Sequence, residues 1–156
     1  MHFTEFHTRL AVYGLVVNEA DELLLTWFNG STGAPPCWTM PGGGVEFDET
    51  LHDALVREFE EETGYRVTPG RFLAENHITV PATATRAPVR SQRFLVEVAI
   101  DSGALGTIEV GGTTDFAEWV PLERARELQP RAEIVDVALG VLTRGRASGA
   151  QPNVNE

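Results

Sequence analysis

Lysine is absent from this chain of 156 residues, cysteine occurs once, and no apolar run is long. The single cysteine, Cys37, cannot form an internal disulfide, and a thiolate metal site would need other ligand types beside it. No segment approaches the roughly 20 apolar residues that span a bilayer, and the N-terminus, MHFTEFHTRL, has neither a cationic leader nor an apolar stretch. The sequence therefore predicts a cytoplasmic protein without membrane partners.

Positive charge is scarce throughout the chain. The twelve basic residues, all arginines, stand against 23 acidic residues, which gives a net charge of −11. Binding to a nucleic acid polymer depends on rows of basic side chains, so this class of partner is excluded. The acidity is also local, because eight acids and one base lie between residues 46 and 62. Such a run is either a solvated face or a site for a cation.

Length and an apolar content of 42% predict one globular domain, residues 1–146, followed by a polar tail, 147–156, that we expect to be disordered. The elements lack regular βαβ repetition, so the predicted fold class is α/β with a mixed sheet between helices. The first two strands, joined by a short polar turn, are expected to form an antiparallel hairpin. Strands are expected at 9–17, 22–28, 66–80, 92–100 and 118–120, and helices at 51–63, 122–128 and 134–144.

The segment 51–63 has the apolar spacing of a helix that packs against a sheet. Thr50 is its expected N-cap, with Asp53 three residues later, and Gly64 is a natural stop. At about 100° per residue, five apolar side chains gather into one arc. They are Leu51, Ala54, Leu55, Val56 and Phe59.

Three carboxylates of this helix do not follow the pattern of a solvated face. Glu58 and Glu62 point into the apolar arc and Glu61 lies at its edge, whereas Asp53 and Glu60 point the other way. Three like charges beside a partly buried surface destabilise the fold unless a cation neutralises them. Oxygen ligands suit hard divalent cations, so the cluster predicts a site for Mg²⁺, with Mn²⁺ as a substitute.

A glycine-rich turn, Pro41-Gly42-Gly43-Gly44, is expected just before the helix. Glycines let the backbone approach a ligand closely, so that carbonyls or amides there can serve as ligands. Arg57, the one base of the acidic stretch, follows Glu49 by eight residues. We expect these two to pair and to hold the loop against the helix, the alternative being a surface arginine.

These residues fill a known signature: a glycine, five residues, a glutamate, seven residues, and then Arg-Glu-apolar-any-Glu-Glu-any-Gly-apolar. In this chain the fixed positions are Gly43, Glu49 and those of the stretch 57–65. The chain therefore resembles the Nudix hydrolase superfamily. The segments 38–42 and 118–122 also look like that family, and the mild departure is Tyr65, where an aliphatic residue is commoner.

The resemblance implies an α/β/α sandwich with a mixed β-sheet. It also implies Mg²⁺-dependent hydrolysis of a phosphoanhydride bond in a nucleoside diphosphate linked to another moiety, such as a nucleoside triphosphate, ADP-ribose or a nucleotide sugar. By matched position, the metal ligands would be Glu58, Glu61, Glu62 and the Gly42 carbonyl. The catalytic set would be Glu58, Glu61, Arg57 and Glu49, with Glu49 supporting Arg57.

Two kinds of substrate-side residue stay open. Relatives often add an acid from a loop beyond the fourth strand, and the candidates here are Asp115, Glu118 and Glu109. Arg90 and Arg93 either meet phosphates from a strand beside the site or are exposed. Trp27 either stacks a base or sugar or belongs to the core.

The principal alternative to an enzyme is a nucleotide-binding sensor or regulatory module on the same fold. Degenerate catalytic acids would indicate it, but the signature is intact. The expected partner is a nucleotide-type small molecule, and a homodimer is left open.

Overall fold

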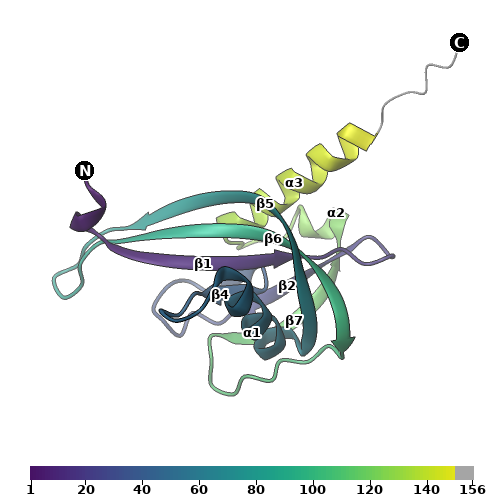
Figure 1. Cartoon of the computed structure of the whole chain (residues 1–156), viewed down its shortest axis with the longest axis horizontal. Helices are drawn as coiled ribbons and strands as arrows, with labels where there is room; N and C mark the ends of the chain where they lie inside the picture. Colours follow the sequence, from purple (N-terminus) through teal and green to yellow (C-terminus); the bar gives the residue numbers. More distant parts are fainter. Residues whose placement is uncertain (150–156) are drawn as a thin grey trace, which may run out of the picture.

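The computed structural model describes residues 1–149, whose strands form two sheets rather than one (Figure 1). In the larger sheet β1 runs parallel to β6 and antiparallel to β4, while β5 runs antiparallel to β6, so this sheet is mixed, as predicted. Its order is β4 (Gly42–Gly44), β1 (His7–Leu15), β6 (Val89–Gly103) and β5 (Tyr65–Val80). The smaller sheet has the order β3 (Cys37–Thr39), β2 (Glu22–Phe28) and β7 (Thr114–Pro121).

The predicted hairpin between the first two strands is wrong. A strand has two edges, and those of β1 are taken by β4 and β6, while β2 pairs with β3 and β7. The chain passes from one sheet to the other after Leu15, where a bridge joins Val17 to Leu23. The Leu24 amide donates to the Val16 carbonyl at 3.3 Å in the same place.

The helices agree more closely with the sequence. Helix α1 (Leu51–Thr63) has the predicted bounds, and it is followed by α2 (Leu122–Ala125) and α3 (Glu133–Gly149), after a short N-terminal 3₁₀ turn, Phe3–Glu5, that was not predicted. Because α3 continues to Gly149, the first three residues of the expected disordered tail are helical; the remainder, 150–156, lies outside the described residues. No helix in the described part of the chain is long and apolar enough to cross a bilayer.

Helices α1 and α3 cover opposite sides of the strands (Figure 1). Side chains alternate between the two faces of a strand. Ala11 and Tyr13 of β1 accordingly pack in the cluster that contains α3, whereas Val12 packs with α1. The five apolar residues of the predicted arc all join the α1 cluster. The α/β/α sandwich is therefore confirmed, with α1 facing the edge strand β4.

Both ends of α1 follow from local chemistry. Thr50 Oγ1 accepts a hydrogen bond from the Asp53 amide at 3.1 Å, and Asp53 Oδ2 accepts from the Thr50 amide at 3.4 Å, which completes a capping box. Gly64 ends the helix at φ 76°, in the left-handed region that favours glycine. A Cβ on Gly64 would overlap the Ala104 carbonyl, so the loop after β6 packs directly on this end of the helix.

Replacing Gly64 with alanine should destabilise the protein by about 2 kcal/mol or more, because the substitution adds backbone strain to a clash with Ala104. Gly145→Ala in α3 is the matched control: a Cβ there meets no atom within 4 Å in the described residues, so about 0.5 to 1 kcal/mol of stabilisation is expected. Chemical denaturation measures both. Equal effects of the two substitutions would contradict the role assigned to Gly64.

Candidate functional site

Arg57 ties the loop before α1 to the helix, as the sequence predicted. Its guanidinium forms two bonds with Glu49, 2.6 Å from Nε to Oε1 and 2.9 Å from Nη2 to Oε2. Nη2 also donates to the Gly44 carbonyl at 3.1 Å, which joins strand β4 to the same clamp. Hydrogen bonding to Arg57 lowers the pKa of the Glu49 carboxyl to about 2, and the same bond raises the pKa of Arg57.

The three carboxylates of α1 differ in burial, in the order expected from their positions on the helix. Glu62 is 5% exposed, whereas the side chains of Glu58 and Glu61 are 16% and 40% exposed. Nη1 of Arg57 donates to Glu58 Oε1 at 3.0 Å and to Glu61 Oε2 at 3.4 Å. One guanidinium therefore serves as partner to two of the three acids.

The glycine segment before the helix is strand β4, not the tight turn that we expected. The Gly42 amide donates to Glu62 Oε2 at 3.3 Å. A Cβ on Gly43 would lie 2.7 Å from the Glu58 carboxyl carbon, so any side chain there would displace that acid. The Thr114 side chain, at the start of β7, also lowers the pKa of Glu62 and so lies close to its carboxyl. The sequence did not indicate Thr114 as a site residue, because it belongs to no motif. Only the pairing of β7 within its sheet brings it close to the helix.

Burial raises the pKa values of the two inner carboxyls. For Glu62 desolvation is the main cause and repulsion from Glu58 the second, and its pKa lies well above the usual range. Desolvation also raises the pKa of Glu58, against the opposing effect of Arg57. Repulsion from Glu109 adds to both shifts. The structure thus concentrates negative charge that the protein itself neutralises incompletely.

Of the three later acids left open by the sequence, Glu109 is the one beside the cluster. The loop after β6 is bound to the end of α1: the Ile108 and Glu109 amides donate to the Glu61 carbonyl at 2.8 and 3.0 Å. Thr107 Oγ1 donates to the Glu62 carbonyl at 2.8 Å. This loop therefore delivers the Glu109 side chain to the carboxylates of α1.

The other two acids bond elsewhere. Asp115, the second residue of β7, accepts a hydrogen bond from Asn29 Nδ2 at 3.0 Å. Glu118 pairs with Arg124 of α2 at 3.1 Å on an exposed surface. Trp27 packs edge-on against Trp38, with ring centroids 5.4 Å apart, and borders the core cluster, as its core interpretation predicted.

The two arginines of β6 do not act together, because they lie on opposite faces of the larger sheet. Arg90 lies 4.7 Å from the centroid of the Phe3 ring and donates to Gln92 at 2.9 Å. Arg93 lies three positions further along β6, opposite Asn76 of β5, on the face that α3 covers.

Comparison with known proteins places this arrangement in a family. A model of the NUDIX domain matches residues 7–138. The chain belongs to the Nudix family.

Several Nudix relatives match over part of their length. A stretch of 58 residues, 37% of this chain and 33% of the relative, is 40% identical to the ADP-ribose pyrophosphatase of Methanocaldococcus jannaschii. Over 67 residues, 43% of this chain and 50% of the relative, it is 31% identical to the CTP pyrophosphohydrolase of Escherichia coli. Over 103 residues, 60% and 64% of the two chains, it is 33% identical to the RNA pyrophosphohydrolase of Dinoroseobacter shibae. The chain thus spans less than two thirds of each.

Solved structures match over nearly the whole chain. The solution structure of the E. coli ORF135 protein superimposes with a TM-score of 0.67 and 21% identity, covering 97% of this chain and 100% of that one. The crystal structure of the MutT protein from Methanosarcina mazei Go1 gives a TM-score of 0.64 and 24% identity, covering 94% and 99%. At these identities the likeness establishes the fold.

The residues of this Nudix site fit a divalent cation by donor chemistry. The donors are hard carboxylate oxygens, one of them buried, with a raised pKa and a second acid repelling it. Within residues 1–149, no three acidic, histidine or cysteine side chains already converge on one point. Nη1 of Arg57 bonds one oxygen of Glu58 and one of Glu61, so the second oxygen of each carboxylate is not bonded to this guanidinium.

The ion pair between Glu49 and Arg57 should make the free energy of unfolding depend on pH. Its folded-state pKa, about 2, lies below the ordinary value of 4.5, so the stabilisation is present above pH 4.5 and is lost as pH falls toward 2. Glu49→Gln should be less stable than wild type at pH 7, and the gap should narrow below pH 4.5. Urea unfolding across this range measures it, with Asp48→Asn at an exposed neighbouring position as control. A gap that stays constant to pH 3 would refute the ion pair.

Glu62→Gln should leave the chelated protein as stable as wild type at pH 7, or stabilise it by roughly 1 kcal/mol. The raised pKa of Glu62 means that its ionised form weakens the folded state as pH rises, and glutamine removes that charge while keeping an oxygen for the Gly42 amide. Added Mg²⁺ should then stabilise wild type more than the variant. Thermal melts test both parts. A much lower melting temperature of Glu62→Gln in chelator would make Glu62 a structural residue.

Proposed function

We propose that this chain hydrolyses, with Mg²⁺, a phosphoanhydride bond in a nucleoside diphosphate linked to another moiety. The observation that carries the proposal is the set of carboxylates on α1, packed against the glycine strand β4 with Glu62 almost fully buried. Such incompletely neutralised charge weakens the fold by itself and is useful when a cation binds. The intact Nudix signature and the pyrophosphohydrolase names of several relatives support the same reaction class.

Each residue near the helix has a role in this proposal. Glu58, Glu61 and Glu62 would hold the cation, for which Mn²⁺ is a substitute, with the Gly42 carbonyl as a further ligand. A bound divalent cation would neutralise phosphate charge and polarise the phosphoryl group. Arg57, held by Glu49, orients two of the acids through Nη1.

We assign to Glu109 the role of orienting or deprotonating the attacking water. Its loop is bonded to the backbone of Glu61 and Glu62, and its charge acts on Glu58 and Glu62. A carboxylate in this position would orient or deprotonate a water beside the bound phosphates. Glu109 is preferred to Asp115 and Glu118 because those two side chains bond Asn29 and Arg124.

The proposed substrate class follows from charge as well as from the relatives. A chain with a net charge of −11 repels polyanions, so nucleotide binding should depend on the metal to bridge the two. The relatives' names include ADP-ribose, CTP and RNA, which share a nucleoside attached to phosphates. A cytoplasmic location remains a prediction, and a homodimer stays open.

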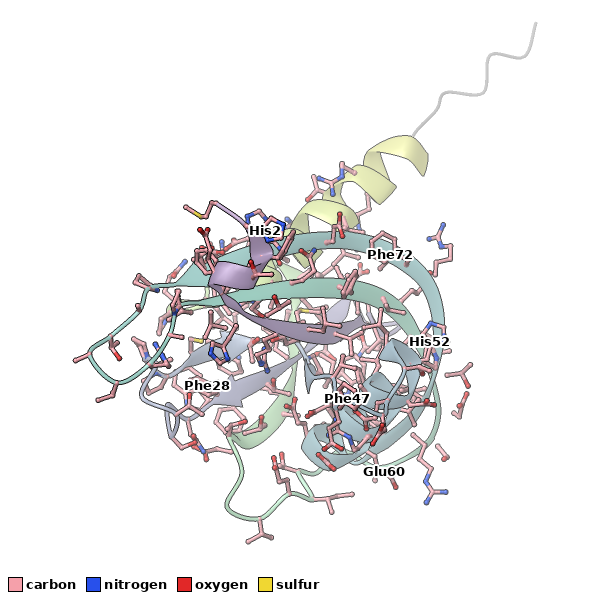
Figure 2. The ribbon with its side chains drawn as sticks, turned by 60° about the vertical axis from the view of Figure 1, so that its left-hand side comes forward. His2, Phe28, Phe47, His52, Glu60 and Phe72 are labelled. Carbon is pink, nitrogen blue, oxygen red and sulfur yellow. The ribbon has the colours of Figure 1, made fainter. Side chains whose placement is uncertain are left out.

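The proposal is tested with Mg²⁺ and a panel of nucleoside triphosphates, ADP-ribose and nucleotide sugars. Turnover should vanish on chelation and return with Mg²⁺ or Mn²⁺. Glu58→Gln and Glu61→Gln should each lower kcat at least about 100-fold, because they remove charge that holds the metal opposite the transition state. Glu60→Gln is the matched control, since Glu60 lies on the same helix (Figure 2) and pairs with Arg66 on an exposed surface. Full turnover in excess chelator, or equal losses in all three variants, would refute the mechanism.

A further inference from the structure

Strand β5 is an edge of the larger sheet, where β6 is the one strand that pairs with it in the described part of the chain (Figure 1). The backbone groups on the outer side of an edge strand bind further strands unless the edge is protected. The first half of β5 is protected by irregularity, because its register with β6 shifts after Arg66, after Pro69 and after Phe72. The segment 74–80 pairs with β6 without a shift and contains neither proline nor lysine. This segment is therefore an open edge.

The charge of this region differs from that of the whole chain. Between residues 65 and 93 lie five of the twelve arginines but only one of the 23 acids, Glu75. The excess of acids elsewhere makes two copies of the chain repel each other. The edge strand of the smaller sheet that exceeds three residues, β7, itself carries Asp115 and Glu118. Two copies therefore approach each other with least repulsion at β5.

The side chains of 74–80 alternate between the two faces of the strand. Glu75, His77 and Thr79 are exposed, whereas the residues between them are half-buried on the face that α3 covers. Helix α3 thus packs on a face of this segment and does not pair with its edge. Glu75 accepts a hydrogen bond from Gln92 Nε2 at 3.2 Å. Within residues 1–149, neither Glu75 nor His77 forms an ion pair.

We propose that the segment 74–80 is the interface of a homodimer, in which the β5 strands of two copies pair antiparallel about a two-fold axis at Asn76. Such an axis places residues opposite each other at equal distances on either side of it. Glu75 of each copy then lies opposite His77 of the other, so an acid faces a basic side chain twice. The imidazole has an N–H to donate to the carboxylate in either protonation state.

The position of the axis follows from these side chains. An axis at Glu75 would oppose two acids, and an axis at His77 would oppose two imidazoles, whereas an axis at Asn76 opposes unlike groups. Asn76 itself would lie opposite its own copy, and a carboxamide has both a donor and an acceptor to exchange. In the single chain, Asn76 Oδ1 has no hydrogen-bond partner among the described residues.

The strand order keeps this interface away from the carboxylates of α1. Strands β5 and β4 are the opposite edges of the larger sheet, so pairing through β5 would join two four-stranded sheets into one with a β4 strand at each end. The glycine strand and the α1 carboxylates beside it would remain outside the interface in both copies. The inference is therefore independent of the proposed hydrolysis.

Sedimentation equilibrium over a range of protein concentrations tests the interface. Wild type should form a dimer with a Kd of roughly 10 μM or lower. His77→Glu should raise this Kd at least about tenfold, because it opposes two acids at both positions, and Glu75→His should also raise it. The double variant, Glu75→His with His77→Glu, restores an acid opposite a basic side chain and should bring the Kd back to within about threefold of wild type.

The double variant separates pairing from folding, because it carries both substitutions and differs from the single variants only in which groups are opposed. Ala99→Glu is the control for added charge, since Ala99 is an exposed residue of β6 outside the interface, and its Kd should equal that of wild type. The proposal is overturned if wild type is monomeric at about 100 μM. It is also overturned if the single variants dimerise like wild type, if Ala99→Glu weakens the dimer as much as His77→Glu, or if the double variant stays monomeric.

Discussion

Helix α1 holds Glu58 and Glu62 against the backbone of strand β4, and this packing of like charges is the constraint around which the site is organised. Desolvation and mutual repulsion raise the pKa values of both carboxyls. Three features offset part of this cost: the Arg57 guanidinium, the Gly42 amide and the Thr114 side chain. Each comes from a different segment, so the carboxylates can be held only when α1, β4 and β7 are correctly assembled.

The parts that depend on local chemistry could be predicted from the sequence. The capping box of Thr50 and the left-handed Gly64 fix both ends of α1, and helical geometry alone orders its three carboxylates by burial. The pairing of Arg57 with Glu49 follows from spacing within one signature. Strand pairing is not local: β1 and β2 are adjacent in sequence, yet β1 pairs with a segment more than eighty residues away. Glu109 could not be chosen over Asp115 for the same reason, since backbone bonds from its loop to α1 decide its position.

The separation of Arg90 from Arg93, by contrast, can be derived from the sequence. The sequence prediction treated both arginines as candidate phosphate contacts, although they lie three positions apart in one strand. An odd separation places two side chains on opposite faces of a regular strand. Arg90 accordingly packs against the Phe3 ring, while Arg93 lies on the face of the sheet that α3 covers. Parity along β6 is enough to separate the two arginines, but it does not indicate what each side chain contacts, because that depends on residues of other segments.

The division into two sheets determines which charged side chains share a sheet. Because β1 pairs with β4 on one edge and β6 on the other, the glycine strand beside the α1 carboxylates, Arg9 of β1 and Arg93 of β6 belong to one continuous sheet. Had β1 paired with β2 as a hairpin, one of these neighbours would have been displaced to another sheet. The observed order places the glycine strand β4 at one edge, Arg9 of β1 beside Gly44, and Arg93 on β6, two strands from that edge. Because α1 covers the Val12 side of this sheet and α3 covers the side of Ala11 and Tyr13, the carboxylates of α1 and the Arg93 side chain lie on opposite faces of the same strands.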